Sequence, residues 1–322
     1  MNNEIDISIV VPVYNEEGNI YPFIDRIKKS IKDKLTYEVI FCADPSTDNT
    51  DNILKKICKK NINLKTIFFS RRFGQPMAVM AGILNCKGKT CVIIDVDLQD
   101  PPELIPMLYK KFKDGYDVVY AKRKTRKGET LVKKIITFLG YKLINKIARV
   151  EIPKNTGDFR IISRKVIEEL RKLPETHGFL RGLIAIIGYK QTSIEYDREK
   201  RLTGNGNYNR FFGSLKIGFN GIISFSSFLL TLNLLAGILI AFSSFLIVIW
   251  IIINKLFYNT DYALGIPTII VLITFIGGVQ LIAIGILGEY IGRIYDEVKN
   301  RPRFIIDHTL NLSKIIDDGS KS

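Results

Sequence analysis

Short apolar runs alternate with helical patterns along the first 120 residues. The apolar runs predict strands at Ile7–Val13, Tyr37–Ala43, Leu64–Phe69, Thr90–Asp95 and Asp117–Ala121. Between them, apolar residues recur at helical spacing, which predicts helices at Asn19–Ile31, Asp48–Lys59, Met77–Asn85 and Pro102–Lys113. Strands that alternate with helices are typical of an α/β fold with a mostly parallel sheet. In such sheets ligands bind beyond the carboxyl ends of the strands, so the residues that follow each strand are the candidates for function.

The second part of the chain contains two long stretches without Asp, Glu, Lys or Arg. One covers the 38 residues from Ile217 to Asn254, and the other covers the 27 residues from Tyr262 to Gly288. About 20 apolar residues are enough to cross a bilayer. We therefore expect transmembrane helices from about Phe228 to Ile253 and from Ile266 to Leu287, joined as a hairpin. The alternative is a pair of buried helices in a large soluble core.

These patterns divide the chain into four parts. We expect a cytosolic α/β domain over 1–208, an interfacial amphipathic helix over 209–227, two transmembrane helices over 228–288, and a cytosolic juxtamembrane helix and tail over 289–322. The loop between the two spans carries one basic and one acidic residue, whereas several Lys and Arg residues lie before the first span and after the second. The positive-inside rule then predicts that both termini are cytoplasmic.

Charge indicates the kind of partner. Lys and Arg number 47 and Asp and Glu 32, a net charge of +15, which favours an anionic partner such as a nucleotide, a nucleic acid or lipid headgroups. Two membrane spans argue against nucleic acid. Residues 120–150 hold ten Lys or Arg and one acidic residue. Apolar residues recur there at helical spacing, which predicts a helix on the membrane surface; a solvated charged helix over the sheet is the alternative. Only two histidines are present, which excludes a multi-histidine zinc site.

Acidic and polar residues follow three of the predicted strands. Asp95, Asp97 and Gln99 come directly after the apolar run that ends at Ile94. Two carboxylates and an amide oxygen suit Mg²⁺ or Mn²⁺, which accept oxygen ligands and keep positions open for a diphosphate. The alternative is an acidic turn before a proline-capped helix.

Several motifs carry a family resemblance. They are Val10-Val11-Pro12-Val13-Tyr14-Asn15-Glu16-Glu17, the Asp95-Val96-Asp97 motif with Leu98-Gln99-Asp100-Pro101, and Gly157-Asp158-Phe159-Arg160. Together they resemble family-2 glycosyltransferases that act on polyprenyl phosphate, a group related to dolichyl-phosphate mannose synthase. The membrane end, from Gly277-Gly278-Val279-Gln280-Leu281 through Gly288-Glu289-Tyr290-Ile291-Gly292 to Arg301-Pro302, resembles bactoprenol glucosyltransferases. The resemblance covers the chain from about Ile7 to Ile305.

This resemblance implies a GT-A fold and an inverting transfer of one sugar to undecaprenyl phosphate. The implied donor is a nucleotide sugar, foremost UDP-glucose, used with Mg²⁺ or Mn²⁺ at the cytoplasmic face of a bacterial plasma membrane. The product would be a lipid-linked sugar for modifying cell-surface glycans such as lipopolysaccharide, with a homo-oligomer and a flippase as further partners. The alternatives are another sugar, of the mannose or aminoarabinose type, and a non-catalytic membrane scaffold that binds nucleotide sugars.

The resemblance also assigns residues to roles. The residues that would bind the donor are Pro12, Tyr14, Glu16, Asp44, Asp95 and Arg123. The residues that would bind the metal are Asp95, Asp97 and Gln99. The residues that would take part in catalysis are Asp158, Asp97, Arg198 and Arg201. Asp158 matches the proposed base of the family. A phosphate monoester is already mostly dianionic at pH 7, however, so a role in positioning the acceptor is an equal alternative.

Two segments depart from the family pattern. Many relatives have Asp-Asp-Gly-Ser after the second strand, where this chain has Ala43-Asp44-Pro45-Ser46, so one acidic contact to the nucleobase is missing. Relatives also carry Gly-x-Ser-Lys-Tyr where this chain has Gly204-Asn205-Gly206-Asn207-Tyr208. The only tryptophan, Trp250, lies in the first apolar stretch. The Q-x-x-R-W motif of processive synthases is therefore absent, which favours transfer of a single sugar.

Overall fold

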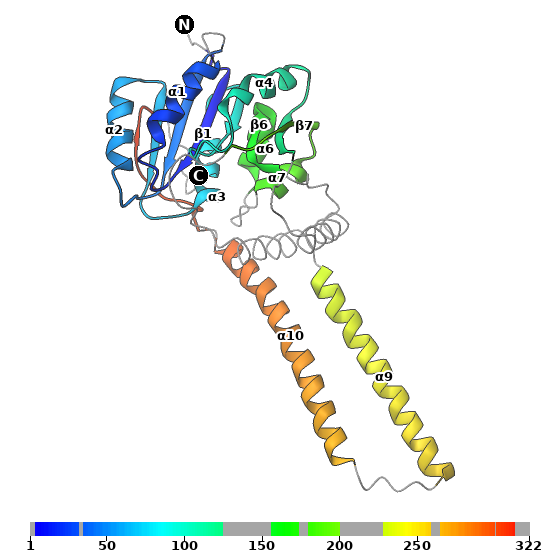
Figure 1. The fold of residues 1–322 in the computed structure, drawn as a ribbon. Helices are drawn as coiled ribbons and strands as arrows, with labels where there is room; N and C mark the ends of the chain where they lie inside the picture. Colours follow the sequence, from blue (N-terminus) through cyan, green and yellow to red (C-terminus); the bar gives the residue numbers. More distant parts are fainter. Residues whose placement is uncertain are drawn as a thin grey trace. The chain divides into compact units, whose positions relative to one another are not determined.

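The computed structural model describes residues 4–31, 35–124, 156–173, 180–199, 228–258, 265–299 and 301–312. The chain divides into two units. The first consists of Met1–Gly213 together with Arg301–Ser322, and the second of Ser214–Asn300. Each unit is described separately below (Figure 1).

The first unit is built on an eight-stranded sheet with the order β7-β5-β6-β4-β1-β2-β3-β8. Its strands are β1 (Ile7–Val13), β2 (Tyr37–Ala43), β3 (Leu64–Phe69), β4 (Thr90–Ile93), β5 (Val118–Arg123), β6 (Thr156–Ser163), β7 (Gln191–Tyr196) and β8 (Ile306–Leu310). β1 pairs in parallel with β2 and β4, β2 with β3, and β5 with β7. β6 runs antiparallel to β4 and β5, and β8 runs antiparallel to β3. The sheet is therefore mostly parallel, as expected.

Helices cover both faces of this sheet (Figure 1). They are α1 (Ile20–Ile31), α2 (Thr50–Lys60), α3 (Gln75–Asn85), the short 3₁₀ helix η1 (Pro102–Leu104), α4 (Ile105–Lys113), α6 (Arg164–Lys172) and α7 (Leu180–Ile187). Apolar residues of α1, α2 and α4 form one core with every second residue of β1, including Ile9 and Val11. α3 packs against the other face of β1 and β2, beside α6. Burial on both faces explains why β1 is a continuous apolar run rather than an alternating one.

The predicted elements of the first 120 residues are present with small shifts in their ends. β4 ends at Ile93, two residues earlier than predicted, and β5 continues to Arg123. The pattern of apolar residues did not predict the strands β6 and β7 or the helices α6 and α7. β6 and β7 extend the sheet on the side of β4.

The carboxyl-terminal segment differs from the expected juxtamembrane helix and tail. Residues 306–310 form β8, which adds an edge strand beside β3. Phe304 is fully buried against Phe69, and the Asn311 amide donates to the carbonyl oxygens of Cys58 and Leu64 at 2.7 and 2.8 Å. The end of the chain is therefore part of the sheet domain, because its apolar residues complete the core next to β3.

The second unit contains two long helices, α9 (Phe228–Tyr258) and α10 (Ile266–Val298). Both predicted apolar segments are thus helical, and α10 continues eleven residues beyond the expected end at Leu287. Within the part of the chain that the structure describes, one helical segment, Phe275–Val298, is long and apolar enough to cross a membrane, and none of it is buried. The interfacial helix expected over 209–227 lies outside the described residues.

Candidate active site

Six strands of the sheet run in the same direction, and their carboxyl ends lie along one edge. β1 to β4 are parallel to one another, and β4 and β5 both run opposite to β6, which gives β5 and β7 the same direction as β4. We call this side the carboxyl edge. β6 begins there, which brings Asp158 to the loops that follow β1, β2, β3 and β4. The chain continues from β1 to β2 on one side and reaches β4 on the other, which is the switch point where such sheets bind ligands.

The loops after β1 and β2 are joined by reciprocal hydrogen bonds. The Asn15 side chain donates to Thr47 Oγ1 at 3.1 Å and accepts from the Thr47 N–H at 2.8 Å. The Glu16 N–H donates to Thr50 Oγ1 at 2.9 Å. Asn15 has a φ of 54°, a left-handed conformation that asparagine tolerates better than most residues. The two loops therefore form one surface at the carboxyl edge.

The predicted donor residues Pro12, Tyr14 and Glu16 lie at this surface. Pro12 is the next-to-last residue of β1, and Tyr14 and Glu16 follow its end. The guanidinium of Arg72, from the loop after β3, stacks 3.9 Å from the centre of the Tyr14 ring. Tyr14 is therefore fixed between two loops, with an aromatic face and a cation side by side.

Asp44 supports the loop after β3. Its two carboxylate oxygens accept the N–H groups of Phe73 and Gly74, both at 2.9 Å, and the residue is buried. Gly74 has a φ of 87°, which favours glycine. In the structure Asp44 thus fixes a loop of the edge, and its predicted contact with the base or ribose remains a prediction.

The loop after β4 carries the predicted metal ligands. Asp97 Oδ1 accepts the N–H of Gln99 at 3.2 Å, and Gln75 donates its side-chain amide to Asp95 Oδ1 at 2.8 Å. Leu98, between these ligands, is buried with a φ of 59°. For a branched side chain this is a strained conformation that the surrounding structure must enforce. The chain therefore turns at Leu98, between Asp97 and Gln99.

Negative charge is in excess at this loop. Burial, followed by the charges of Asp158, Asp97 and Asp100, raises the pKa of Asp95 to about 8. A bound cation would offset this repulsion, so the donor chemistry fits a divalent metal ion. Among the described residues, no group of three or more His, Cys, Asp or Glu side chains is arranged to hold a metal. The predicted set uses the Gln99 amide as its third ligand, and it stays a prediction.

Asp100, one residue beyond the predicted ligands, is the centre of a polar cluster. It is 1% exposed, and its Oδ1 accepts a short hydrogen bond from the Tyr196 hydroxyl. The same oxygen lies 3.7 Å from Arg123 Nη2 and 3.4 Å from Arg198 Nε. Burial and the Asp100 charge raise the pKa of Tyr196 to about 12, so its hydroxyl stays protonated and continues to donate. Two of the predicted arginines, Arg123 and Arg198, therefore meet at one carboxylate.

Asp158 is held between two further arginines. Arg181 Nε lies 3.0 Å and Arg160 Nη2 lies 3.4 Å from Asp158 Oδ1. Burial raises the pKa of Asp158, but the charges of Arg181 and Arg160 outweigh it and hold the pKa below its usual value. Arg160 is completely buried, and among the described residues its Nη1 has no hydrogen-bond partner. Asp158 is thus a stable carboxylate and a weak base.

Gly157 leaves space for the Arg123 guanidinium next to Asp158. A Cβ atom at Gly157 would lie 2.8 Å from Arg123 Nη2, so the guanidinium packs on the bare backbone. The motif that contains Gly157 and Asp158 therefore supplies a carboxylate and the space for an arginine. Arg201, the glycine-rich segment 204–208 and the basic segment 125–155 lie outside the described residues.

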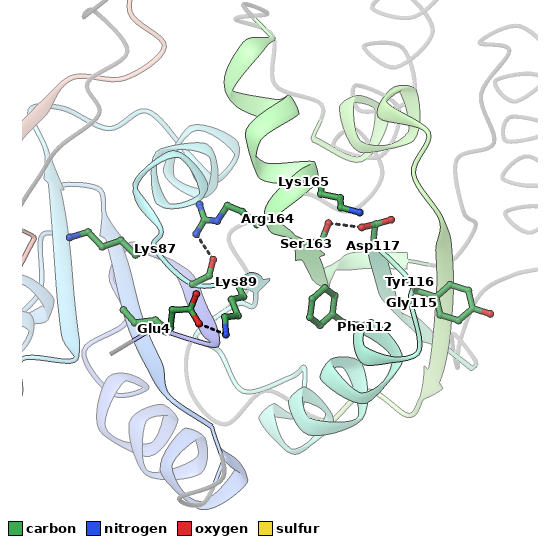
Figure 2. Close-up of a pocket in the computed structure, with 12 residues that line it drawn as sticks. Glu4, Lys87, Lys89, Phe112, Gly115, Tyr116, Asp117, Ser163, Arg164 and Lys165 are labelled. Atoms are coloured by element: carbon green, nitrogen blue, oxygen red, sulfur yellow. Dashed lines mark hydrogen bonds and ion pairs between the residues drawn. The ribbon is translucent and has the colours of Figure 1, made fainter. Parts of the chain in front are cut away.

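A hollow of about 950 Å³ lies at the opposite, amino edge of the sheet, far from these groups (Figure 2). Two of its acidic residues have partners within the hollow: Glu4 pairs with Lys89 at 2.6 Å, and Asp117 accepts a hydrogen bond from the Ser163 hydroxyl at 2.9 Å. Arg164 donates to the carbonyl oxygen of Cys86 at 3.1 Å. None of the predicted site residues lines this hollow.

Comparison with known proteins identifies the family of the chain. Residues 8–171 match the model of the family described as "Glycosyl transferase family 2". The chain belongs to glycosyltransferase family 2. It is 40% identical, over 93% of its length and 97% of the relative, to the "SfII prophage-derived bactoprenol glucosyl transferase" of Shigella flexneri. It is 42% identical, over 97% and 96%, to the "Uncharacterized glycosyltransferase YkcC" of Bacillus subtilis.

Among solved structures, this glycosyltransferase is similar to the mannosyltransferase PcManGT from Pyrobaculum calidifontis in complex with GDP-Man and Mn²⁺. The TM-score is 0.47 and the identity 18%, and the match covers 68% of this chain and 61% of that one. The family and the observed sheet identify the first unit as a GT-A-like α/β fold.

The sequence did not predict four residues that contact the predicted site residues in the structure: Asp100, Tyr196, Arg160 and Arg181. Asp100 and Arg160 belong to the motifs that carry the family resemblance, but their spacing in the sequence does not indicate with which charged side chains they pair. Tyr196 lies beside Arg123 only because β7 pairs with β5 in this register. Arg181 comes from α7, a helix that the pattern did not predict.

Proposed function

We propose that this glycosyltransferase moves one glucose from UDP-glucose to undecaprenyl phosphate, with inversion, at the cytoplasmic face of a bacterial plasma membrane. The observation that carries the proposal is the 40% identity to a protein named bactoprenol glucosyl transferase over nearly the whole of both chains. The arginines at the carboxyl edge support it, because the donor and the acceptor both carry phosphate, and the carboxylates there fit a divalent metal ion.

The donor would bind where the loops after β1, β2 and β4 meet. Asp95, Asp97 and Gln99 would hold Mg²⁺ or Mn²⁺, which when bound stabilises the charge that develops on the leaving diphosphate. Tyr14, Glu16 and Asp44 would line the nucleoside side. Arg123 and Arg198 would neutralise phosphate oxygens through their guanidinium N–H groups, which form strong charge-assisted hydrogen bonds.

Asp158 would act as a positioning group. Its lowered pKa makes it a weak base, and a dianionic phosphate acceptor does not need deprotonation to attack the anomeric carbon. With one oxygen facing Arg181 and Arg160, Asp158 would orient these arginines beside the acceptor phosphate.

The membrane part of the proposal rests on the stretches of α9 and α10 that carry no Asp, Glu, Lys or Arg, each of which has more than 20 residues. Both termini and the sheet domain would be cytoplasmic, where nucleotide sugars are available. In a protein freed of native cysteines, a cysteine at Asn259 should react with an impermeant thiol reagent added outside intact cells, and one at Lys314 should not. The reverse pattern would overturn this topology.

The reaction itself is tested with the purified full chain in detergent. UDP-glucose, other UDP-sugars, GDP-mannose and an aminoarabinose donor, each radiolabelled, are offered with undecaprenyl phosphate. Undecaprenol, which has the same tail and no phosphate, is the matched control. We expect label in the lipid only with UDP-glucose and the phosphate, and loss of transfer in EDTA. Transfer from another donor would overturn the sugar assignment, and transfer to undecaprenol would overturn the acceptor assignment.

A further inference from the structure

We propose that Asp100 is a positioning residue that sets Arg123 and Arg198 in place for phosphate binding. The inference rests on the proposed function, because it concerns the arginines that would face the donor and acceptor phosphates. The inference goes beyond the proposed function because it assigns a role to Asp100, the buried carboxylate that contacts both arginines.

The first observation is the convergence of three groups on one oxygen. Asp100 Oδ1 accepts from the Tyr196 hydroxyl and lies 3.4 Å from Arg198 Nε and 3.7 Å from Arg123 Nη2. Tyr196 Oη also accepts from Arg123 Nε at 3.3 Å. A hydroxyl and a carboxylate thus fix the direction of the Arg123 guanidinium, and the carboxylate fixes that of Arg198.

The second observation is the balance of charge. Asp100 is buried, whereas the side chains of Arg123 and Arg198 are 18% and 33% exposed. Among Asp100, Arg123 and Arg198, one carboxylate faces two guanidinium groups, so these three side chains together carry a net positive charge. Each guanidinium has five N–H donors in a rigid fork, and the contacts with Asp100 use only part of them. The cluster therefore presents donors and excess positive charge, which suits a phosphate.

The third observation is the connection to the predicted metal loop. The Glu199 N–H donates to the Gln99 carbonyl oxygen at 3.0 Å, next to Arg198 and Asp100. Arg26 bridges Glu103 at 2.6 Å and Glu199 at 2.9 Å. The segment that carries Arg198 is therefore attached to the loop of Asp97 and Gln99. Asp100 holds cationic groups at a fixed distance from the predicted metal ligands.

The test replaces Asp100 by its neutral isostere in the full chain. Asp100→Asn should lower kcat/KM for transfer by about 10- to 100-fold, the usual cost of removing a residue that orients groups around a metal site. The matched control is Asp114→Asn, which removes an exposed carboxylate whose ion pair, among the described residues, is with Lys111 at 3.5 Å. This variant should keep the rate of the unmodified protein. A normal rate in Asp100→Asn would overturn the inference.

A second measurement separates positioning from general stability and needs no turnover. Phenylglyoxal modifies arginines that are not held by a carboxylate, and mass spectrometry follows each arginine separately. In Asp100→Asn, Arg123 and Arg198 should react several-fold faster, while Arg164 at the amino edge reacts as before. Unchanged reactivity of both would overturn the inference even if transfer falls. If the unmodified protein transfers no sugar, the proposed function fails, and this measurement still decides the role of Asp100.

A double-mutant cycle provides the third measurement. If Asp100 acts through Arg198 and Arg123, then Asp100→Asn should cause a smaller loss in the Arg198→Gln background than in the unmodified protein. Fully additive losses would indicate an independent role and overturn the inference.

Should Asp100→Asn fail to fold, Tyr196→Phe removes one of the three contacts and keeps the charge. It should raise the reactivity of Arg123 more than that of Arg198, because Tyr196 also touches Arg123. Equal or absent changes would contradict the arrangement.

Discussion

The two edges of the sheet handle buried charge in opposite ways. At the amino edge, Glu38 is 1% exposed, and both of its oxygens are used: one accepts from the Ser8 hydroxyl and the Lys87 N–H, and the other from Lys65 at 2.5 Å. At the carboxyl edge, by contrast, repulsion between neighbouring carboxylates raises the pKa of Asp95 to about 8, after the effect of burial. The first edge is electrostatically complete without a ligand. The second is not.

The backbone shows the same contrast. Two of the three described non-glycine residues with positive φ, Asn15 and Leu98, lie in loops of the carboxyl edge. Strain and unbalanced charge both cost folding free energy, and a protein keeps them where they serve binding. The difference between the edges therefore separates residues that stabilise the fold from residues that serve the reaction, and substitutions at the two edges should have different effects.

The largest effect should come from Asp97→Asn at the carboxyl edge. Loss of this carboxylate removes electrostatic stabilisation of the leaving diphosphate, so the transfer rate should fall by about 10²- to 10³-fold. The melting temperature should not fall, because a repulsive charge has been removed. Parallel assays of transfer and thermal unfolding check both. A retained rate would show that Asp97 is not a ligand.

Gly157→Ala should have the next largest effect. Its Cβ would lie 2.8 Å from Arg123 Nη2 and would displace that guanidinium without disturbing the backbone. We expect kcat/KM to fall by about 10- to 100-fold, as for other changes that misplace a binding group. Gly237→Ala in α9 is the control, because no atom lies within 4 Å of its Cβ position. Equal activities of the two variants would contradict the assignment of Arg123.

Glu38→Gln at the amino edge should lower the stability of the protein and leave the transfer rate unchanged. It leaves Lys65, whose side chain is 11% exposed, without its negative partner, and breaking such a buried pair costs about 3–5 kcal/mol. The melting temperature should therefore fall clearly, while the rate per folded molecule stays the same. A loss of rate with an unchanged melting temperature would break the distinction between the edges.

The smallest effect should be that of pH on Asp158. Its lowered pKa keeps it ionised throughout the range from pH 5 to 8, so it should add no inflection to kcat/KM there. We expect a rise near pH 6 that comes from the second ionisation of the acceptor phosphate and persists in Asp158→Asn. An additional inflection that disappears in Asp158→Asn would identify Asp158 as a base after all.

Much of the first unit could be predicted from local pattern. β1, β2 and β3 are buried apolar runs bounded by polar turns, and the structure has them with the predicted ends. The rule that ligands bind at carboxyl ends directed attention to Asp44, Asp95 and Arg123, all of which lie at that edge. These features depend on sequence neighbours and on the direction of strands, which a single sequence reveals.

The remaining features depend on contacts between distant segments. Asp100 meets Tyr196 across 96 residues, and β8 pairs with β3 across more than 230. β8 has the sequence Ile-Asp-His-Thr-Leu, with three polar residues between two apolar ones, and it is too short to identify its partner. The register that brings these segments together is set by packing of the whole domain, and no local periodicity encodes it.

The position of β8 has a consequence for biosynthesis. The ribosome makes β3 early and β8 last, after α9 and α10, at about 5–20 residues per second. Until then β3 is an open edge, and Phe69 lacks the Phe304 ring that later covers it. An unpaired edge strand can pair with another chain. The sheet therefore closes only after α9 and α10 have been synthesised, so the sheet domain is completed later than the two long helices that interrupt its sequence.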